Sequence, residues 1–312
     1  MTGEACALRV LTWNIYHGGR DDDSTDECNR RQAAEYAASL APDVFVCIET
    51  YGAAETILAA LNRNDHGWTY SGRRITRGVD DNLWIFSRLP VLEELPAPDG
   101  LGINDFHAGG VRVRLGNGRV AAVYDVWSSY TEPWIGDLID ENVRDAAAGR
   151  EPRHAEADIL AADRVPTAMI ADFVAYADRH SPDAADAAIL GGDLNTVASA
   201  DWAAEWAPCH AGLSYPLVAT RQLEDAGFVD AFRAVHPDAC AEPGVSWSPR
   251  LSLAAPARID LAFVRGAGVT VDDARLLSDR LPEHTTGADA ARPYYSDHAA
   301  LLVDYRIEGS AA

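Results

Sequence analysis

The chain has 312 residues, of which 26 are basic and 48 acidic, so its formal net charge is −22. All of the basic residues are arginine, because the sequence contains no lysine. This excludes a P-loop lysine, a Schiff-base lysine and a lysine general base, and it leaves arginine, metal ions or backbone amides to bind anions. The acidic balance also disfavours non-specific nucleic-acid binding, which depends mainly on basic contacts to phosphates.

The composition indicates a folded globular protein, since 48% of the residues are hydrophobic and 26 are aromatic (8 Trp, 11 Tyr and 7 Phe). We expect one domain over residues 1–312. The five cysteines are scattered without Cys-x-x-Cys spacing, so we expect neither a disulfide framework nor a structural zinc site. No signal-like start and no membrane-length apolar stretch are present, so we expect a cytoplasmic protein without membrane contact.

Short β-rich runs recur along the chain, with helical patterns between some of them. Eight runs have the composition of strands: residues 8–13, 44–48, 83–86, 111–115, 120–127, 188–190, 259–264 and 300–305. Helical periodicity is found at 27–40, 53–61 and 155–179. Strands outnumber helices, so two packed sheets with helices outside fit this order better than a doubly wound sheet.

Two segments between these runs have a specific interpretation. Residues 111–115 alternate strictly and are followed by Gly-Asn-Gly at 116–118, which predicts a hairpin with one solvated face. Residues 136–158 are polar, charged and weakly periodic, so they form either a lid or insertion or an ordinary solvated connection.

Polar residues gather where the predicted strands begin or end. They are Asn14, Glu49, Asp193, Asn195, Asp260, Asp297 and His298. Any one of them alone is typical of a turn cap or a loop hydrogen bond, because Asp and Asn favour turns. Their order along the chain carries the information.

The ordered motifs are Thr-Trp-Asn at 12–14, Glu49 after an apolar strand, Gly-Gly-Asp-Leu-Asn at 191–195, Arg-Ile-Asp at 258–260 and Ser-Asp-His at 296–298. This series resembles the endonuclease/exonuclease/phosphatase superfamily, the fold of deoxyribonuclease I and exonuclease III. The resemblance covers nearly the whole chain and is specific for the superfamily, though not for a substrate. It implies an α/β (α+β) four-layer sandwich, with two packed, mainly antiparallel β-sheets flanked by helices. It also implies hydrolysis of a phosphate ester with a divalent metal, usually Mg²⁺.

The resemblance assigns the metal side of the site to three residues. Glu49 matches the principal metal carboxylate, Asp297 matches a second metal ligand, and Asn14 lies beside them and holds a metal-bound water or a phosphate oxygen. The chemistry agrees, because Mg²⁺ prefers one or two carboxylates together with water and substrate oxygens. Mn²⁺ is a possible substitute.

The same resemblance assigns the water-activating and phosphate-binding roles. Asp193 matches the base that positions the attacking water, and Asn195 hydrogen-bonds the water or a phosphate oxygen. His298 matches a histidine that contacts the scissile phosphate as general acid or charged donor, with Asp260 orienting its ring.

One position departs from the pattern. Many members end the strand corresponding to 120–127 in an Asn-x-His or Thr-His pair, whereas this chain has Trp127, and an indole has no basic nitrogen. Three interpretations are open. Another donor fills the space, the candidates being Tyr130, His107, His154 or an arginine. Alternatively, residues 127–134 form an aromatic wall for an apolar or sugar-like leaving group, or the site is slow or inactive.

Two further segments have open interpretations. Arg77 ends an arginine-rich run at 73–77, which is either a guanidinium clamp for an anion or a solvated loop. The segment 17–19 (His-Gly-Gly) follows the first motif and either lines the cleft or makes a simple turn.

The leading hypothesis is a Mg²⁺-dependent phosphoesterase that hydrolyses a small phosphorylated molecule or a phosphodiester. The second is a nuclease of the same fold, which the acidic charge makes less favourable. The third is a non-catalytic binding protein that retains the cleft, and Trp127 alone supports it. The substrate, the number of metal ions and the oligomeric state stay open.

Overall fold

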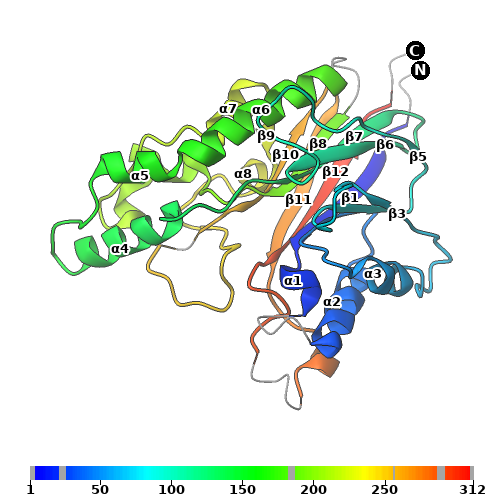
Figure 1. Ribbon diagram of the computed structural model, residues 1–312, viewed down its shortest axis with the longest axis horizontal. Coiled ribbons are helices and arrows are strands. Elements are labelled where there is room, and N and C mark those ends of the chain that lie inside the picture. Colours follow the sequence, from blue (N-terminus) through cyan, green and yellow to red (C-terminus); the bar gives the residue numbers. More distant parts are fainter. Residues whose placement is uncertain (1–3, 21–25, 182–186, 256, 287–291, 310–312) are drawn as a thin grey trace.

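The computed structural model describes residues 4–20, 26–181, 187–255, 257–286 and 292–309. Two six-stranded β-sheets pack face to face (Figure 1). The first sheet has the order β11 (Val269–Leu277), β12 (Ala300–Ile307), β1 (Cys6–Asn14), β2 (Val44–Ile48), β4 (Trp84–Ser87) and β3 (Ser71–Arg74). The second has the order β5 (Val91–Glu94), β6 (Ala108–Arg114), β7 (Val120–Trp127), β8 (Ala187–Asp193), β10 (Asp260–Arg265) and β9 (Val229–Asp230).

Each sheet has one parallel pair, β1 with β2 and β7 with β8, and the other neighbours are antiparallel. The predicted sandwich of mainly antiparallel sheets is therefore confirmed. All eight predicted strand runs coincide with strands, and the predicted hairpin at 111–118 joins β6 to β7. The four strands that the sequence did not predict, β3, β5, β9 and β11, are the outermost strands of the two sheets.

Strand alternation decides which residues face the other sheet. In β1, Leu8 and Val10 enter the core between the sheets, and in β8 Ala187 and Ile189 do the same. Side chains two positions apart in a strand share one face, so the side chain of Asn14 in β1 and that of Asp193 in β8 also point toward the opposite sheet. Close approach of the sheets near this end depends on Gly191, since a Cβ there would lie 2.1 Å from Oγ1 of Thr12.

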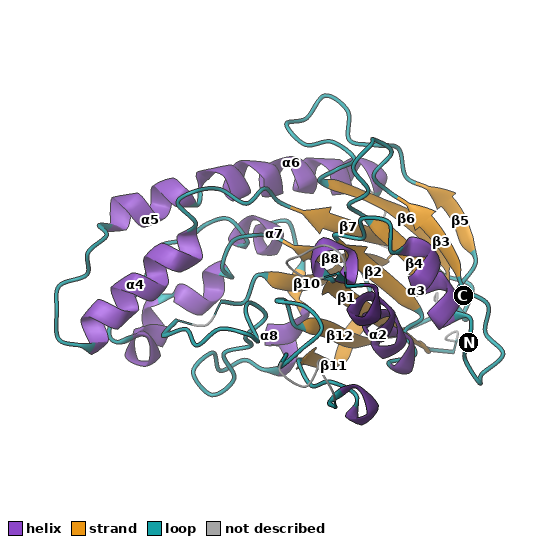
Figure 2. Ribbon diagram, turned by 60° about the horizontal axis from the view of Figure 1, so that its bottom comes forward, coloured by secondary structure: helices purple, strands orange, loops and turns teal. Residues whose placement is uncertain are grey.

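Helices cover the outer faces of both sheets. Figure 2 shows α2 (Glu27–Ser39) and α3 (Ala54–Leu61) against the first sheet and α6 (Arg164–His180) along the second. Their apolar sides form separate clusters with the outward strand residues; Tyr36 of α2, for example, contacts Trp13 of β1 edge to face. The two predicted helices at 27–40 and 53–61 are confirmed. The third is divided by buried Asp163 into α5 (Glu156–Ala162) and α6.

The segment 136–158 is more ordered than its polar composition indicated. Most of its first half is α4 (Ile135–Ala147), which packs Ile139 and Val143 into a cluster with Ile159 of α5. The apolar residues occupy one face of the helix, so the weak periodicity inferred from the sequence was wrong. Figure 1 shows α4 and α5 extending beyond one end of the sheets.

The remaining elements are short. They are α1 (Tyr16–Gly19), α7 (Arg221–Asp225), α8 (Ala231–Val235) and the 3₁₀ helices η1 (Ser199–Trp202), η2 (Ala204–His210) and η3 (Pro282–His284). Within the described ranges, no helix combines the length and the apolar composition needed to cross a bilayer.

The structure contains a disulfide between Cys209 and Cys240, with their Cα atoms 5.6 Å apart. We expected no disulfide framework, and one bond is not a framework, but this pairing is one that the sequence analysis did not predict. The two residues are 31 positions apart, so no local spacing indicated the bond.

Candidate active site

A pocket of about 420 Å³ opens at the edge where β1, β2, β7 and β8 end and where β10 and the segment before β12 begin. The parallel pairs explain this arrangement, because the carboxyl ends of parallel neighbours meet at one edge of a sheet. The residues lining the pocket are Tyr16, His17, Glu49, Trp127, Tyr130, Trp134, Asp193, Asn195, Trp247, Ile259, Asp297 and His298.

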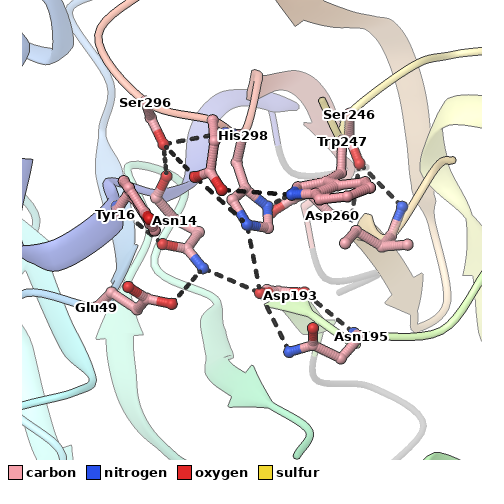
Figure 3. A network of polar contacts seen from close by, with 12 residues as sticks. Asn14, Tyr16, Glu49, Asp193, Asn195, Ser246, Trp247, Asp260, Ser296 and His298 are labelled. Atoms are coloured by element: carbon pink, nitrogen blue, oxygen red, sulfur yellow. Dashed lines mark hydrogen bonds and ion pairs between the residues drawn. The ribbon is translucent and has the colours of Figure 1, made fainter. Parts of the chain in front are cut away.

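The side-chain amide of Asn14 connects the two sheets (Figure 3). Its Nδ2 donates to Oε1 of Glu49 at 3.1 Å and to Oδ2 of Asp193 at 3.0 Å. Its Oδ1 accepts a hydrogen bond from the backbone N–H of Tyr16 at 2.9 Å. The amide therefore holds two carboxylates of the pocket in place.

Glu49 and Asp297 are the pocket carboxylates that keep partial solvent contact. Glu49 follows β2 in a left-handed conformation (φ 55°), and its Oε2 accepts from the backbone N–H of His17 at 3.0 Å. Asp297 accepts from the indole of Trp247 at 3.3 Å, and its side chain is 22% exposed. Both are therefore anchored and still present oxygen to the pocket.

Asp193, Asp260 and His298 form a buried group next to these two carboxylates (Figure 3). The Nδ1 of His298 lies 2.8 Å from Oδ2 of Asp260, and its Nε2 lies 3.9 Å from Oδ2 of Asp193 and 3.8 Å from Oδ1 of Asp297. Asp260 thus fixes the imidazole so that Nε2 is directed at the two other carboxylates.

Burial and neighbouring charges shift both titratable partners. Burial raises the pKa of Asp193 to about 7, with Asp260 adding to the rise and His298 and the Asn14 amide opposing it. Burial lowers the pKa of His298, but the carboxylates of Asp260, Asp297 and Asp193 outweigh it and hold the pKa well above its ordinary value. These three carboxylates therefore favour the cationic form of the imidazole.

Hydrogen bonds from the surrounding chain hold His298 in place. Ser296 donates through Oγ to the carbonyl of Asn14 at 2.8 Å and accepts from the backbone N–H of His298 at 3.0 Å. The indole of Trp13 donates to the carbonyl of His298 at 2.9 Å. The first and last sequence motifs are therefore in direct contact.

Asn195 packs against Asp193. Its backbone N–H donates to Oδ1 of Asp193 at 3.0 Å, and its Nδ2 donates to the carbonyl of Ser128 at 2.8 Å and lies 3.3 Å from Oδ2 of Asp193. It has a left-handed backbone (φ 47°), which Asn tolerates better than most residues. This turn directs both side chains of the 191–195 motif to one side.

Aromatic rings form the opposite wall. Trp127 lines the pocket and stacks on His107 at a centroid distance of 6.1 Å, so His107 lies behind it. The indole N–H of Trp127 is enclosed and has no acceptor among the described residues. Trp134 and Trp247 continue the wall in edge-to-face contact at 4.6 Å, and Tyr130 lies exposed at the rim.

Two residues proposed from the sequence for substrate binding lie elsewhere. His154 contacts Glu141 at 2.5 Å in the α4–α5 region, and it does not line the pocket. Arg77 is exposed and bonds Asp105 through its backbone, also outside the pocket. Neither position supports contact with a ligand held at Glu49 and Asp193.

Sequence reasoning left out or set aside several lining residues. Trp247 lies in a loop, where the sequence pattern carried no signal of a cleft, and Ile259 lies within the Arg-Ile-Asp motif but was not itself singled out. Trp134 belongs to the run 127–134, which one of the alternatives expected to form an aromatic wall, and it lines the pocket. For Tyr16 and His17 the sequence did carry a signal of the cleft, because both residues directly follow the Asn14 motif. The structure places both in the pocket wall.

The donor set fits a hard divalent cation at the Glu49 side. Two partly exposed carboxylates face a pocket whose described lining residues include no arginine to neutralise them. Asp193, Asp260 and His298 also offer ligand atoms within 4.8 Å of one another, but Nδ1 of His298 already bonds Asp260. Oxygen-rich, solvent-accessible carboxylates are the better match for Mg²⁺ than this buried histidine group.

Comparisons with known proteins agree with this geometry. The family model for the endonuclease/exonuclease/phosphatase family matches residues 11–298. A relative from Caenorhabditis elegans, the uncharacterized protein F14F9.5, is 22% identical over 318 residues, covering 96% of this chain and 91% of its own.

Solved structures share the fold. The human Nocturnin catalytic domain with bound sulfate is 15% identical, covers 97% of both chains and has a TM-score of 0.60. D. rerio TDP2 complexed with single-strand DNA product is 16% identical, with 96% and 98% coverage and a TM-score of 0.55. An endonuclease/exonuclease/phosphatase from Beutenbergia cavernae is 16% identical, with 98% and 72% coverage and a TM-score of 0.56. At these identities the likeness establishes the fold alone, whereas the match of the family model over residues 11–298 shows that the chain belongs to the endonuclease/exonuclease/phosphatase family.

Proposed function

We propose that the protein hydrolyses a phosphate ester of a small molecule by metal-assisted attack of water. The observation that carries the proposal is that two anchored, partly exposed carboxylates line the same pocket as Asp193 and His298, whose imidazole is bonded to buried Asp260. The first pair suits a divalent cation, and the second suits proton transfer and charge stabilisation at a phosphate.

Glu49 and Asp297 would hold the metal, with Asn14 keeping Glu49 in position. Bound Mg²⁺, or Mn²⁺ in its place, supplies neutralisation of the phosphate oxygens, which an acidic pocket would otherwise repel. Supporting this assignment, both carboxylates receive a hydrogen bond from one neighbour that fixes their orientation, from His17 and from Trp247.

Asp193 is proposed to take a proton from the attacking water. Its pKa of about 7, raised by burial, matches what a general base needs near neutral pH. Asn14 and Asn195 hold the carboxylate by hydrogen bonds, so its oxygens stay directed to the pocket. His298, oriented by Asp260, donates from Nε2 to the phosphate or to the leaving oxygen.

The surroundings favour a compact substrate over a nucleic-acid strand. The net charge is −22, and the described residues that line the pocket include no arginine to bind a run of phosphates. A nuclease is the second candidate, supported by the shared fold with TDP2 in complex with single-strand DNA product. The salt dependence of substrate binding distinguishes these two candidates, because a nuclease that binds several phosphates loses affinity steeply between 50 and 200 mM salt.

The direct test is turnover of p-nitrophenyl phosphate and bis-p-nitrophenyl phosphate with Mg²⁺ or Mn²⁺, compared with EDTA. We expect metal-dependent turnover that EDTA abolishes and added metal restores. Absence of turnover in a broad phosphoester panel would refute hydrolysis and leave a non-catalytic binding protein.

A further inference from the structure

The segment 49–52, which follows β2 and begins with Glu49, is held by two neighbouring residues, Asp81 and Asn82. Its first two backbone N–H groups donate to Asn82, to Oδ1 and to the carbonyl, and its last two donate to Asp81, to the carbonyl and to Oδ2. The N···O distances in chain order are 3.0, 2.9, 2.7 and 3.0 Å. Four successive N–H groups therefore have acceptors in only two residues.

These hydrogen bonds stabilise a strained backbone. The φ angles of Glu49, Tyr51 and Gly52 are 55°, 34° and 80°. Residues with a side chain rarely adopt positive φ, and such strain persists only where the surroundings enforce it. The place of Glu49 at the pocket therefore depends on the acceptors that Asp81 and Asn82 supply.

Asn82 also connects this segment to the second sheet. It is 0% exposed, and its Nδ2 donates to the carbonyl of Phe106, shortly before β6, at 2.9 Å. The ring of Phe106 contacts that of Trp127 edge to face at a centroid distance of 5.5 Å, and Trp127 lines the pocket. One amide thus uses its acceptor for the backbone of Glu49 and its donor for the segment that supports the aromatic wall.

The amides of Asn14 and Asn82 hold different parts of Glu49. Asn14 donates to the carboxylate at Oε1, whereas Asn82 accepts from the main chain. The first contact orients the carboxylate, and the second places the backbone from which it extends. Only a side chain with both an acceptor and a donor can make the two bonds of Asn82, so the amide suits this buried position.

We infer that Asn82 is a positioning residue of the proposed metal site, because its side chain places Glu49 through the backbone N–H and ties that place to the wall at Trp127. This inference rests on the proposed function for its metal ion. Asn82 does not line the pocket, so it acts through Glu49.

The experiment compares wild type with Asn82→Ala and Asn82→Asp, and with Asn142→Ala as a matched control. Asn142 is also 0% exposed and lies outside the pocket; its Oδ1 accepts from the backbone N–H of His154 and its Nδ2 donates to the carbonyl of the same residue, both at 2.9 Å. The two Ala variants therefore lose equivalent hydrogen bonds, but only one of them loses a contact to Glu49. Asn82→Asp keeps the oxygen that accepts from Glu49.

The measurements are Mn²⁺ affinity of the full chain by electron paramagnetic resonance, Mg²⁺ affinity by competition with Mn²⁺, and Tm. Glu49→Gln is the reference that identifies the Mn²⁺ bound at the pocket, since the acidic surface binds further ions. If Asn82→Ala does not fold, Asn82→Ser takes its place, because its hydroxyl is too short to reach both partners.

We expect Asn82→Ala to weaken Mn²⁺ binding about 10-fold, because groups that orient metal ligands carry effects of this size. Asn82→Asp should recover most of the lost affinity. Asn142→Ala should lower Tm as Asn82→Ala does and leave Mn²⁺ affinity unchanged.

Wild-type Mn²⁺ affinity in folded Asn82→Ala would overturn the inference, as would an equal loss of affinity in Asn142→Ala. If wild type binds Mn²⁺ but turns nothing over, the proposed hydrolysis fails, and the affinity ratio still decides the role of Asn82. If wild type binds Mn²⁺ no better than Glu49→Gln, the metal assignment fails and the inference fails with it.

Discussion

The side-chain amide of Asn14 donates a 3.0 Å hydrogen bond to Oδ2 of Asp193, and this contact links the last residue of β1 to the last residue of β8. The two strands belong to different sheets. The distance between Asn14 and the proposed base is therefore determined by sheet packing. This relationship explains why residues 179 positions apart lie at one point.

Replacing Asn14 by Ala should weaken both carboxylates that its amide holds. We expect activity to fall about 10- to 100-fold and the Mg²⁺ concentration for half-maximal activity to rise, because groups that orient metal ligands carry effects of this size. Titration of activity against Mg²⁺ checks this. Asn117→Ala is the control, since that amide bonds the carbonyl of Ile307 far from the pocket. An unchanged Mg²⁺ requirement in Asn14→Ala would contradict the anchoring role.

Residues 16–19 form a turn in which all four φ angles are positive, and within it Gly18 should tolerate a side chain far less well than Gly52, a glycine with positive φ outside the turn. A Cβ on Gly18 (φ +67°) would lie 2.5 Å from the Arg30 guanidinium and 2.8 Å from the carbonyl of Thr50, whereas a Cβ on Gly52 (φ +80°) meets nothing within 4 Å. Gly18→Ala should lower Tm and activity together, because the turn must open. Gly52→Ala should cost only the conformational strain of about 1–2 kcal/mol and leave kcat/KM unchanged. Thermal melts and steady-state kinetics measure Tm and kcat/KM for both variants. Equal losses of Tm and kcat/KM in Gly18→Ala and Gly52→Ala would contradict this prediction.

Because of buried Asp125, we expect the free energy of unfolding to fall as the pH rises. It is fully buried on β7, and burial raises its pKa well above the ordinary value, opposed by the nearby backbone amide of Trp84. Neither oxygen makes a hydrogen bond of ordinary geometry with a described residue. The folded chain therefore keeps a proton that the unfolded chain loses near pH 4, so stability drops by up to about 1.4 kcal/mol per pH unit until the folded pKa is reached.

Asp125→Asn should remove this slope and raise Tm at pH 7–8, measured by circular dichroism from pH 5 to 8. Asp201→Asn is the control, because the pKa of Asp201 is shifted in the opposite direction and its replacement should destabilise the protein. Burial tends to raise the pKa of Asp201, but Arg258 and Arg233 outweigh it and hold the pKa below its ordinary value. Its loss should destabilise by about 3 kcal/mol throughout pH 5 to 8, and this effect should shrink only as the pH falls through the lowered pKa of the folded carboxylate. A Tm advantage of Asp125→Asn that does not grow with pH would contradict the buried-acid interpretation.

The Cys209–Cys240 bond should contribute stability without affecting activity. It closes a loop with a sequence separation of 31 residues, for which chain entropy predicts about 3–4 kcal/mol. The double variant Cys209→Ser/Cys240→Ser should lower the free energy of unfolding in urea by that amount and keep kcat/KM, because neither residue lines the pocket. Cys6→Ser, at a cysteine outside the disulfide, should be close to neutral. A reduced wild type as stable as the oxidised protein would refute this contribution.

The central strands could be predicted from sequence, and the edge strands could not. Strands such as β2 and β8 are buried on both faces and read as apolar runs, whereas β3 is Ser-Gly-Arg-Arg and β11 carries two adjacent aspartates. An edge strand has solvent on one side and needs no apolar run. The helix α4 was missed for a related reason, since its apolar stripe is diluted by charged residues on the exposed face.

The polar residues of the site could be assembled from motif order, but its walls could not. Asn14, Asp193 and Asp260 stand at strand ends, where topology brings them together whatever the loops do. Trp134 belongs to the run 127–134 that was expected as a possible aromatic wall, whereas Trp247 comes from a long connection whose path is decided by tertiary packing. His17 depends on a run of left-handed residues that propensities disfavour, so only the following glycines hinted at it.

The most direct test of the central claim is the Asp193→Asn variant, assayed on bis-p-nitrophenyl phosphate with Mg²⁺ at pH 8 beside wild type. The account predicts a kcat at least about 1,000-fold lower with little change in KM, because the base that takes the proton from water is removed. Tm should not fall, since Asn relieves a carboxylate whose pKa burial raises to about 7. An Asp193→Asn enzyme that is folded and as active as wild type would contradict the claim that water is activated at this residue.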